Sequence, residues 1–419
     1  MQQQFQRVLD ELKLDDAPAG GALVIYHQGK EVVNVATGNA LPDLAWSAKT
    51  LSVNFSIGKG VMATLIAILV SQGMLDYEAP ISRYWPEFAD NGKANIRLKQ
   101  VLSHSAGLFD ITSITTDANL LLDWEQMIQR VAAMPVSIPK GQDEQHYASA
   151  YSALVSGWVL GALVERVTGL GLNDALNRYL AEPLDVAGEL YYGVDEALLP
   201  MIAKPERYFY QSPDKSTPRR KPVLKPDSEK TLHTLGHLPV SGMWQRALGE
   251  QAISTSAINR LYFDTSRMNL ANYKNALMPN AKDGLEYHRD DVLMAKIPAA
   301  NGVSTANALA RIYAMHAADG IHDGQVLIVP EVIAQMRQIQ TEGYDAVMPA
   351  DMRWRMGFHR VFSLQDTQIA YGHMGYNGSV AFCDPKRQLA FVFIHNFDTT
   401  MLNDVRQFAL SEMALDIFS

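Results

Sequence analysis

The sequence has little of several features that would place it in other protein classes. Cys383 is the only cysteine, which excludes an intramolecular disulfide and a zinc site built from cysteine ligands. The longest apolar run, residues 61–70, has about ten residues and is too short to span a bilayer, so we expect no membrane association. The formal net charge is −9 and no basic patch is dense, which argues against nucleic-acid binding. The first residues show no basic segment followed by an apolar one, so no secretory signal is visible and a cytoplasmic location is expected.

The most apolar helix-like run follows a serine and a lysine that are three positions apart. At this spacing Ser56 and Lys59 share one face of a helix. A serine hydroxyl becomes a good nucleophile when a neighbouring base takes its proton, and a poorly solvated lysine can act as that base. We interpret the pair as a candidate nucleophile and base, against the plainer interpretation of Ser56 as a helix N-cap. The Ser-x-x-Lys pattern occurs three times, at Ser56/Lys59, Ser137/Lys140 and Ser212/Lys215. Only the first match lacks an internal proline and leads into an apolar run.

A serine nucleophile also needs an acid/base group and two donors for the oxyanion of the tetrahedral intermediate. The backbone N–H of Ser56 itself supplies one donor. The second donor must come from a place where the backbone approaches closely, and glycines mark such places. The best candidate is the segment 372–379, which has three glycines between two predicted strands.

Further motif-like segments follow the nucleophile along the chain. They are 75–77, 84–88, 102–108 and 372–375, with Asp384-Pro385 in the final hairpin and Asn396 after it. Together with residues 55–60 they resemble the serine hydrolases of the class C β-lactamase and penicillin-binding-protein fold, and most closely the family VIII-type carboxylesterases. The resemblance covers nearly the whole chain. Residues 372–375 stand where β-lactamases have Lys-Thr-Gly and many esterases have His-x-Gly or Trp-x-Gly.

The resemblance implies a third catalytic residue, a tyrosine at the start of a helix. Tyr147 and Tyr151 compete for this role, and the looser Tyr-x-Ala pattern of the esterases favours Tyr151. By resemblance, Tyr151 is a phenolate-type acid/base, and the backbone N–H of Tyr376 is the second oxyanion donor. His373 and Gly375 then belong to the substrate site, where His373 either shapes the pocket or makes a direct catalytic contact.

The resemblance also bears on the substrate, because the chain departs from the β-lactamase pattern. His373 and Met374 replace the lysine and threonine that help to hold a drug's carboxylate, and Ala153 replaces the asparagine of Tyr-x-Asn. We therefore expect a carboxylesterase that cleaves small esters through a serine acyl-enzyme, without cofactor or metal ion. A β-lactamase or D-amino-acid peptidase is the alternative of the same fold. A catalytically silent binding or scaffold relative is the alternative of another class, and the oligomeric state is not indicated.

The predicted fold is α+β. Strands at both ends, with helices between them, predict one antiparallel sheet formed by N- and C-terminal strands and flanked by helices. We expect a sheet lobe of residues 1–92 and 187–419, a mostly helical lobe of residues 93–186, and the active site between them. The predicted strands are 22–26, 32–36, 356–362, 368–375, 379–383 and 389–394, with a loop at 38–50. The predicted helices are 1–14, 56–73 with a glycine cap at its end, 151–167, 172–180, 305–318 with Ser304 as its cap, 330–338 and 401–417.

Other polar features receive plainer interpretations. His104 is expected to be a hydrogen-bonded structural histidine. His233 and His237 have the i, i+4 spacing of metal ligands, but no carboxylate motif accompanies them, so a metal site is not favoured. The pocket walls are expected to come from loops that include 109–146 and 200–245.

Overall fold

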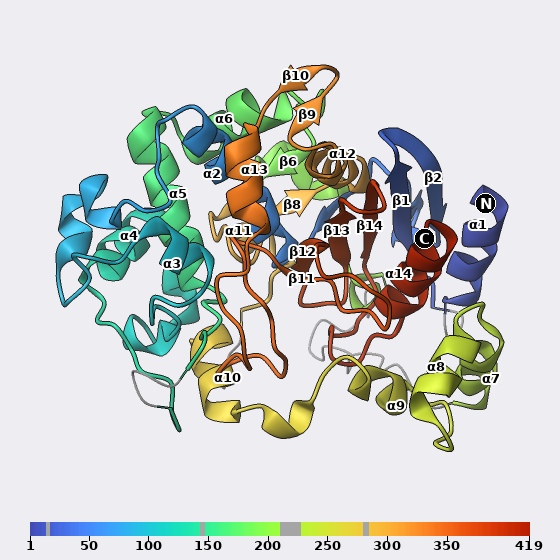
Figure 1. Cartoon of the computed structure of the whole chain (residues 1–419). Coiled ribbons are helices and arrows are strands. Elements are labelled where there is room, and N and C mark those ends of the chain that lie inside the picture. Colours follow the sequence, from blue (N-terminus) through green and yellow to red (C-terminus); the bar gives the residue numbers. More distant parts are fainter. Residues whose placement is uncertain (14–16, 143–146, 210–227, 280–284) are drawn as a thin grey trace, which may run out of the picture.

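The computed structural model describes residues 1–419 except 14–16, 143–146, 210–227 and 280–284 (Figure 1). Its largest sheet has six strands, and every neighbouring pair is antiparallel. The first strand of the chain pairs with the last, so that Gly21 lies opposite His395. The predicted α+β fold, with one antiparallel sheet made from both ends of the chain, is confirmed. The strand order is β11 (His359–Arg360), β12 (Tyr371–Met374), β13 (Val380–Asp384), β14 (Leu389–His395), β1 (Gly21–His27) and β2 (Lys30–Thr37).

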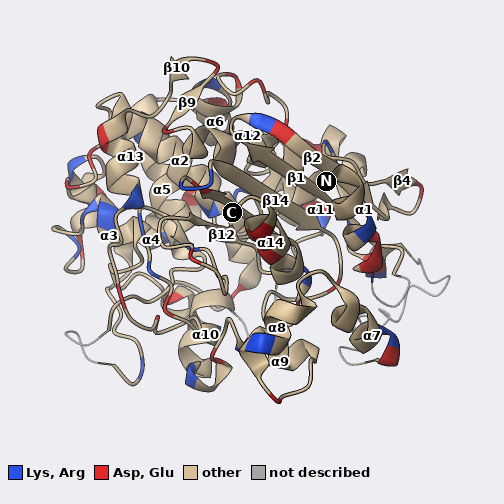
Figure 2. Cartoon of the chain, turned by 45° about the vertical axis from the view of Figure 1, so that its right-hand side comes forward, with Lys and Arg blue, Asp and Glu red and all other residues tan. Residues whose placement is uncertain are grey.

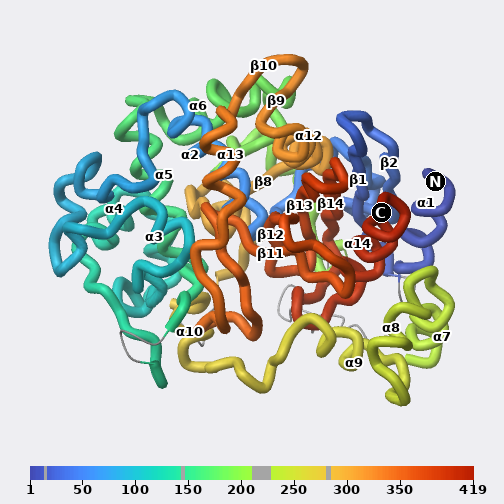
Figure 3. The backbone as a smooth tube through the Cα atoms, in the orientation of Figure 1, coloured from blue at the N-terminus to red at the C-terminus, as the bar shows by residue number. Residues whose placement is uncertain are grey.

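This sheet separates two hydrophobic cores, because successive side chains of a strand point to opposite faces. Strand β14 contributes Val392 and Ile394 to one core and Phe391 and Phe393 to the other. The first core packs against α2 and α12, and the second is covered by α1 and α14, which lie side by side near both chain ends (Figures 1 and 3). These helices are α1 (Gln2–Glu11), α2 (Ile57–Ser71), α12 (Ala306–Ala317) and α14 (Arg406–Ile417).

Helix α2 is the buried centre of the helical part of the molecule. It packs against α5, α13 and strand β12, and it ends before Gly73, whose φ of +72° stops the helix as predicted. One hydrophobic core runs from α4 and α5 through α2 to the sheet. The predicted division into two lobes stays a prediction. The other helices of this part are α3 (Leu98–Leu102), α4 (Trp124–Ala133), α5 (Val155–Thr168), α6 (Leu172–Leu176) and α13 (Pro330–Arg337).

A second, smaller sheet leads the chain into the nucleophile motif. Its order is β6 (Leu190–Tyr191), β8 (Val303–Ser304), β5 (Leu51–Val53) and β7 (Ile202–Ala203), and β5 ends just before Ser56. The predicted loop 38–50 contains two short paired strands, β3 (Asn39–Leu41) and β4 (Leu44–Ala45), and β9 (Ile321–His322) pairs with β10 (Gln325–Val326). Residues 229–294 contain helices that were not predicted: α7 (Glu229–His237), α8 (Ser241–Leu248), α9 (Thr255–Arg260), α10 (Leu270–Leu277) and α11 (Asp290–Met294).

Several predicted boundaries were wrong. Helix α5 begins at Val155 and α14 at Arg406, four and five residues later than expected. The cap of α12 is Thr305, whose side chain accepts the N–H of Ala308, and not Ser304. The predicted strand 356–362 is reduced to β11, because Gly357 turns the chain with a φ of +84°.

Two features of the whole molecule complete the description. No single helix among the described residues is long and apolar enough to cross a membrane. Helix α5 and the segment Leu172–Ala181 reach that length and apolar character only when taken together, and the chain bends by 77° between them. Lysine and arginine are interspersed with aspartate and glutamate over the visible elements (Figure 2).

Candidate active site

The chain turns sharply between β5 and α2, and Ser56 stands at this turn. Phe55 has a φ of +48°, a left-handed conformation that is uncommon for a residue with a side chain. The N–H of Ile57 donates to the carbonyl oxygen of Asn54 at 3.1 Å and closes the turn. Ser56 therefore precedes the first turn of α2 and stays partly exposed, whereas Lys59 is only 5% exposed. Backbone strain of this kind is concentrated at functional sites.

Three oxygen atoms surround the amine of Lys59. Its Nζ lies 3.1 Å from Ser56 Oγ, 2.7 Å from the carbonyl oxygen of Ala153 and 2.6 Å from that of Ala299. Burial lowers the pKa of Lys59 well below its ordinary value. The pair found by its spacing is thus in direct contact, and its lysine is in an environment that favours the neutral amine.

Tyr151 approaches the same serine from the segment that precedes α5. Its hydroxyl donates to Ser56 Oγ at 2.8 Å, and its ring stacks on Trp354 with centroids 5.3 Å apart. Burial raises the pKa of Tyr151, so the phenol keeps its proton near neutral pH and a phenolate is not the resting form. Tyr147, the competing candidate, is partly exposed and does not line the cavity beside Ser56.

The end of β12 lies against the Ser56 turn. A Cβ atom on Gly375 would lie 2.9 Å from the carbonyl oxygen of Asn54, so a side chain here would push the strand end away. Neither the N–H of Ser56 nor that of Tyr376 donates to an acceptor in the described part of the chain. Both predicted oxyanion donors are therefore available to a ligand.

His373 is buried in the wall of the site, beside the catalytic candidates. Its ring centroid lies 6.3 Å from that of Tyr151, and its Nδ1 lies 2.9 Å from the carbonyl oxygen of Met374. Burial lowers the pKa of His373 well below its ordinary value, so the imidazole is neutral. His359, whose ring is 4.8 Å from that of His373, lines the same wall and was not predicted.

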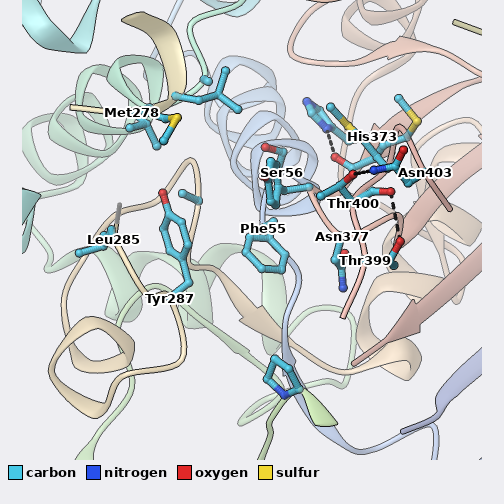
Figure 4. A pocket seen from close by; sticks show the side chains of 18 of the residues that line it. Phe55, Ser56, Met278, Leu285, Tyr287, His373, Asn377, Thr399, Thr400 and Asn403 are labelled. Carbon is cyan, nitrogen blue, oxygen red and sulfur yellow. Dashed lines mark hydrogen bonds between the residues drawn. The ribbon is translucent and has the colours of Figure 1, made fainter. Parts of the chain in front are cut away.

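A cavity of about 620 Å³ opens beside Ser56. Asn396, which the sequence analysis placed among the motif-like segments, lines the cavity. The wall residues from 273–279, 285–288 and 397–403 belong to no motif and were not predicted. The expected loop 200–245 contributes Pro205 and Arg207, and no described residue of 109–146 lines the cavity. Figure 4 shows Ser56 between an apolar side with Met278, Leu285 and Tyr287 and a polar side with His373, Asn377, Thr399, Thr400 and Asn403.

A network of ionised side chains forms part of the cavity wall. Arg207 contacts Asp398 at 2.5 Å and Glu286 at 2.6 Å. Burial alone would raise the pKa of Glu286. The hydrogen bond to His288 and the charge of Arg207 outweigh this effect and lower the pKa to about 2. Arg207 is the only lysine or arginine among the described residues that line the cavity. Because two carboxylates already pair with it, the described wall offers no free cation to a substrate.

Of the remaining histidine candidates, His104 borders the site, with its ring centroid 5.0 Å from that of Tyr151. His104 is buried, and its Nδ1 accepts the N–H of Ser152 at 3.2 Å, which agrees with the structural role expected for it. His233 and His237 stack on each other, with the carbonyl oxygen of His233 2.8 Å from Nδ1 of His237. The described residues contain no group of three or more His, Cys, Asp or Glu side chains placed to hold a metal ion.

The chain is similar to known hydrolases over most of its length. It is 31% identical over 382 residues to Esterase/beta-lactamase LipL of Mycobacterium tuberculosis (strain ATCC 25618 / H37Rv), covering 90% of this chain and 77% of the relative. The crystal structure of a family VIII carboxylesterase superposes with a TM-score of 0.75 at 25% identity, covering 99% of this chain and 97% of the other. The crystal structure of a penicillin-binding protein homologue from Caulobacter crescentus superposes with a TM-score of 0.72 at 27% identity. The match covers 99% of this chain and 96% of the other.

The family assignment rests on the extent of these matches. The family model described as Beta-lactamase matches residues 5–412, which is nearly the whole chain. The protein is therefore a serine hydrolase, and the chain belongs to the Beta-lactamase family.

Proposed function

We propose that the protein is a carboxylesterase that hydrolyses neutral esters through an acyl-enzyme on Ser56. The observation that carries the proposal is the placement of Ser56 Oγ, 3.1 Å from Lys59 Nζ and 2.8 Å from the hydroxyl of Tyr151. This arrangement offers the serine a neutral base on one side and a protonated phenol on the other. The esterase names of the relatives support the same reaction class.

Acylation follows from the protonation states of the three side chains. Ser56 Oγ attacks the ester carbonyl carbon while its proton passes to the amine of Lys59. The oxyanion accepts hydrogen bonds from the N–H groups of Ser56 and Tyr376, each worth roughly 3–4 kcal/mol in related sites. As the bond to the alcohol breaks, Tyr151 gives its proton to the leaving alkoxide, and the ammonium of Lys59 restores that proton to the phenolate.

Deacylation uses Lys59 for both proton transfers. A water molecule attacks the acyl carbon while the neutral amine of Lys59 accepts one of its protons. The tetrahedral intermediate then expels Ser56 Oγ, which takes the proton back from Lys59, and the carboxylic acid leaves. Each half-reaction begins and ends with a neutral lysine and a protonated Tyr151.

The cavity wall supports neutral substrates over carboxylates. β-Lactam drugs and peptides ending in D-alanine carry a carboxylate, whose burial needs a cation or several donors. Arg207 is already paired with Asp398 and Glu286. The apolar side formed by Met278, Leu285 and Tyr287 favours an uncharged acyl group.

Replacement of the nucleophile tests the proposal. Ser56→Ala is expected to abolish turnover of p-nitrophenyl butyrate and labelling by a fluorophosphonate probe, with little change in the thermal unfolding midpoint. Ser137→Ala is the matched control, because Ser137 is the serine of another Ser-x-x-Lys match and does not line the cavity. Undiminished turnover by Ser56→Ala would exclude Ser56 as the nucleophile, and a wild-type protein that the probe does not label would point to a silent relative.

The charge of the substrate is tested separately. We expect kcat/KM for p-nitrophenyl butyrate to exceed that for p-nitrophenyl hemisuccinate by at least about tenfold, because only the second ester brings a carboxylate to a wall without a free cation. Nitrocefin, measured on the same preparation, is expected to be a poorer substrate still. A kcat/KM for nitrocefin above that for the butyrate would favour the β-lactamase alternative.

A further inference from the structure

Met374 stands where β12 no longer pairs with β11, although it still pairs with Val380 of β13. Strand β11 pairs with β12 only through His359 and Arg360, which lie opposite Gly372 and Tyr371. The N–H of Met374, beyond the end of this ladder, donates instead to Nε2 of the His359 side chain at 2.9 Å. An imidazole thus takes the place of a missing strand carbonyl.

The partners of His359 fix its tautomer. Its Nδ1 lies 2.6 Å from the carbonyl oxygen of Arg360, which can only accept, so Nδ1 carries the proton. Nε2 is then a bare acceptor, as the bond from Met374 requires. The neutral form is also the stable one, because burial lowers the pKa of His359 to about 4.

His373 holds the other end of the same residue. Its Nδ1 is 2.9 Å from the carbonyl oxygen of Met374, so this nitrogen carries the proton and donates. Its Nε2 is buried and has no partner among the described residues. The two histidines therefore bind the N–H and the C=O of Met374 with opposite polarities, one accepting and one donating.

The constraint continues along the chain to the peptide group between Gly375 and Tyr376. The N–H of Gly375, in the same plane as the Met374 carbonyl, donates to Ser379 O at 2.7 Å. The carbonyl of Gly375 accepts the N–H of Gly378 at 3.0 Å. Because a trans peptide directs its C=O and N–H to opposite sides, this bond also sets the direction of the Tyr376 N–H.

We infer that His359 and His373 are positioning residues that clamp the Met374 peptide and thereby aim the Tyr376 N–H at the oxyanion. The inference rests on the proposed function, because it assumes that Tyr376 supplies an oxyanion donor. An oxyanion donor acts through its placement, and losing one costs about 100-fold to 1,000-fold in kcat. A misplaced donor should therefore lower kcat while leaving substrate binding, and so KM, nearly unchanged.

Amide side chains allow each contact to be kept or removed separately. Glutamine places an amide atom near the position of imidazole Nε2, and asparagine places one near Nδ1. His359→Gln therefore keeps an acceptor for Met374, whereas His359→Asn loses it. For His373 the order is reversed: His373→Asn keeps a donor to the Met374 carbonyl, and His373→Gln does not.

The expected result is a crossed pattern in esterase activity. With p-nitrophenyl butyrate, kcat should be about tenfold or more higher for His359→Gln than for His359→Asn. At the other position the order reverses, and kcat should be about tenfold or more higher for His373→Asn than for His373→Gln. The KM values of all four variants should agree within about threefold. The affinity for a trifluoromethyl ketone, which forms an oxyanion on the serine, should fall in parallel with kcat/KM. Thermal unfolding midpoints of the four variants serve as the control for folding.

Two outcomes would overturn the inference. The first is that glutamine and asparagine give equal kcat at both positions. The second is that losses in kcat follow losses in thermal stability, or appear in KM alone. Measured beside Ser56→Ala, these results separate the two proposals: an inactive Ser56→Ala with no crossed pattern removes the clamp only, whereas an active Ser56→Ala removes the esterase mechanism itself.

Discussion

At the scale of single residues, the three oxygen neighbours of Lys59 can satisfy a neutral amine. A neutral amine has two N–H donors and one lone pair. The carbonyl oxygens of Ala153 and Ala299 can accept both donors, which leaves the lone pair for the hydroxyl of Ser56. No carboxylate pairs with Lys59 among the described residues, so no opposite charge offsets the cost of burying an ammonium there.

Esterase activity should therefore depend on the protonation of Lys59. Because the deprotonated amine is the base, kcat/KM should rise with pH through the pKa of Lys59 and reach a plateau above it. Burial lowers that pKa well below its ordinary value, so the plateau should begin well below pH 10.5. A pH–rate profile with p-nitrophenyl butyrate measures this, and activity that falls over the same range would contradict it.

A variant separates the base from a simple positive charge. Arginine stays protonated, so Lys59→Arg should lower kcat/KM by about 100-fold to 10,000-fold across the whole profile. The rising limb seen in the wild type should then be absent. Near-normal activity of Lys59→Arg would show that Lys59 supplies charge and not a proton acceptor.

The residues that meet at the candidate site could be picked out from the sequence because they lie in local patterns. The spacing of Ser56 and Lys59 placed both on one helix face, and the resemblance selected Tyr151. His359 and Arg207 carry no such signal, because their roles depend on residues far along the chain. His359 acts on Met374 and Arg207 on Asp398, contacts that exist only once the fold brings these segments together.

At the scale of elements, the site is a junction between the end of β12 and the start of α2. Gly375→Ala should separate them, because the added Cβ would lie 2.9 Å from the backbone oxygen of Asn54 and 3.0 Å from Oδ1 of Asn377. We expect kcat to fall by about tenfold or more, since the Tyr376 N–H moves with the strand end. Steady-state kinetics with p-nitrophenyl butyrate provide the measurement.

A second glycine in the chain serves as the control for that substitution. Gly236 lies within α7, and a Cβ added there would meet no atom within 4 Å apart from its chain neighbours and the nearby backbone of its own helix. Gly236→Ala should leave kcat unchanged and should stabilise slightly, because alanine favours a helix by roughly 1 kcal/mol over glycine. Equal kcat values for the two variants would contradict the account of the junction.

Element boundaries were predicted less well than element types, and two of the errors lie beside the site. In the segment before α5, the N–H groups of Tyr151 and Ser152 donate to the side chains of Asp345 and His104. In the segment before α14, the N–H of Met401 donates to the carbonyl of Tyr376. Apolar periodicity continues through both places, so it could not reveal backbone groups committed to distant partners.

At the scale of the whole molecule, buried histidines make the fold sensitive to acid. Burial lowers the pKa of His316 to about 3 and those of His359 and His395 to about 4. The unfolded chain, with ordinary histidine pKa values near 6.5, binds these protons at higher pH than the folded protein does. Their contribution to stability is therefore complete above about pH 6.5 and is lost as pH falls towards about 4.

Urea unfolding at two pH values tests this sensitivity. The free energy of unfolding should be lower at pH 5 than at pH 7.5, by on the order of 2 kcal/mol for each of these histidines. Replacing one of these histidines, as in His316→Gln, should reduce the difference between the free energies of unfolding at pH 7.5 and pH 5. This holds whether the substitution raises or lowers stability itself. Equal unfolding free energies at pH 5 and pH 7.5 would contradict the prediction.

The pairing of the first strand with the last has a consequence for biosynthesis. Asn396 accepts the N–H of Gly20 across 376 residues of sequence, and β1 has no partner for its β14 edge until that part of the chain exists. At translation rates of about 5–20 residues per second, the β1–β2 hairpin waits roughly 20–75 s with this edge and its apolar faces uncovered. We therefore expect the six-stranded sheet to be completed only after the last strand has emerged from the ribosome.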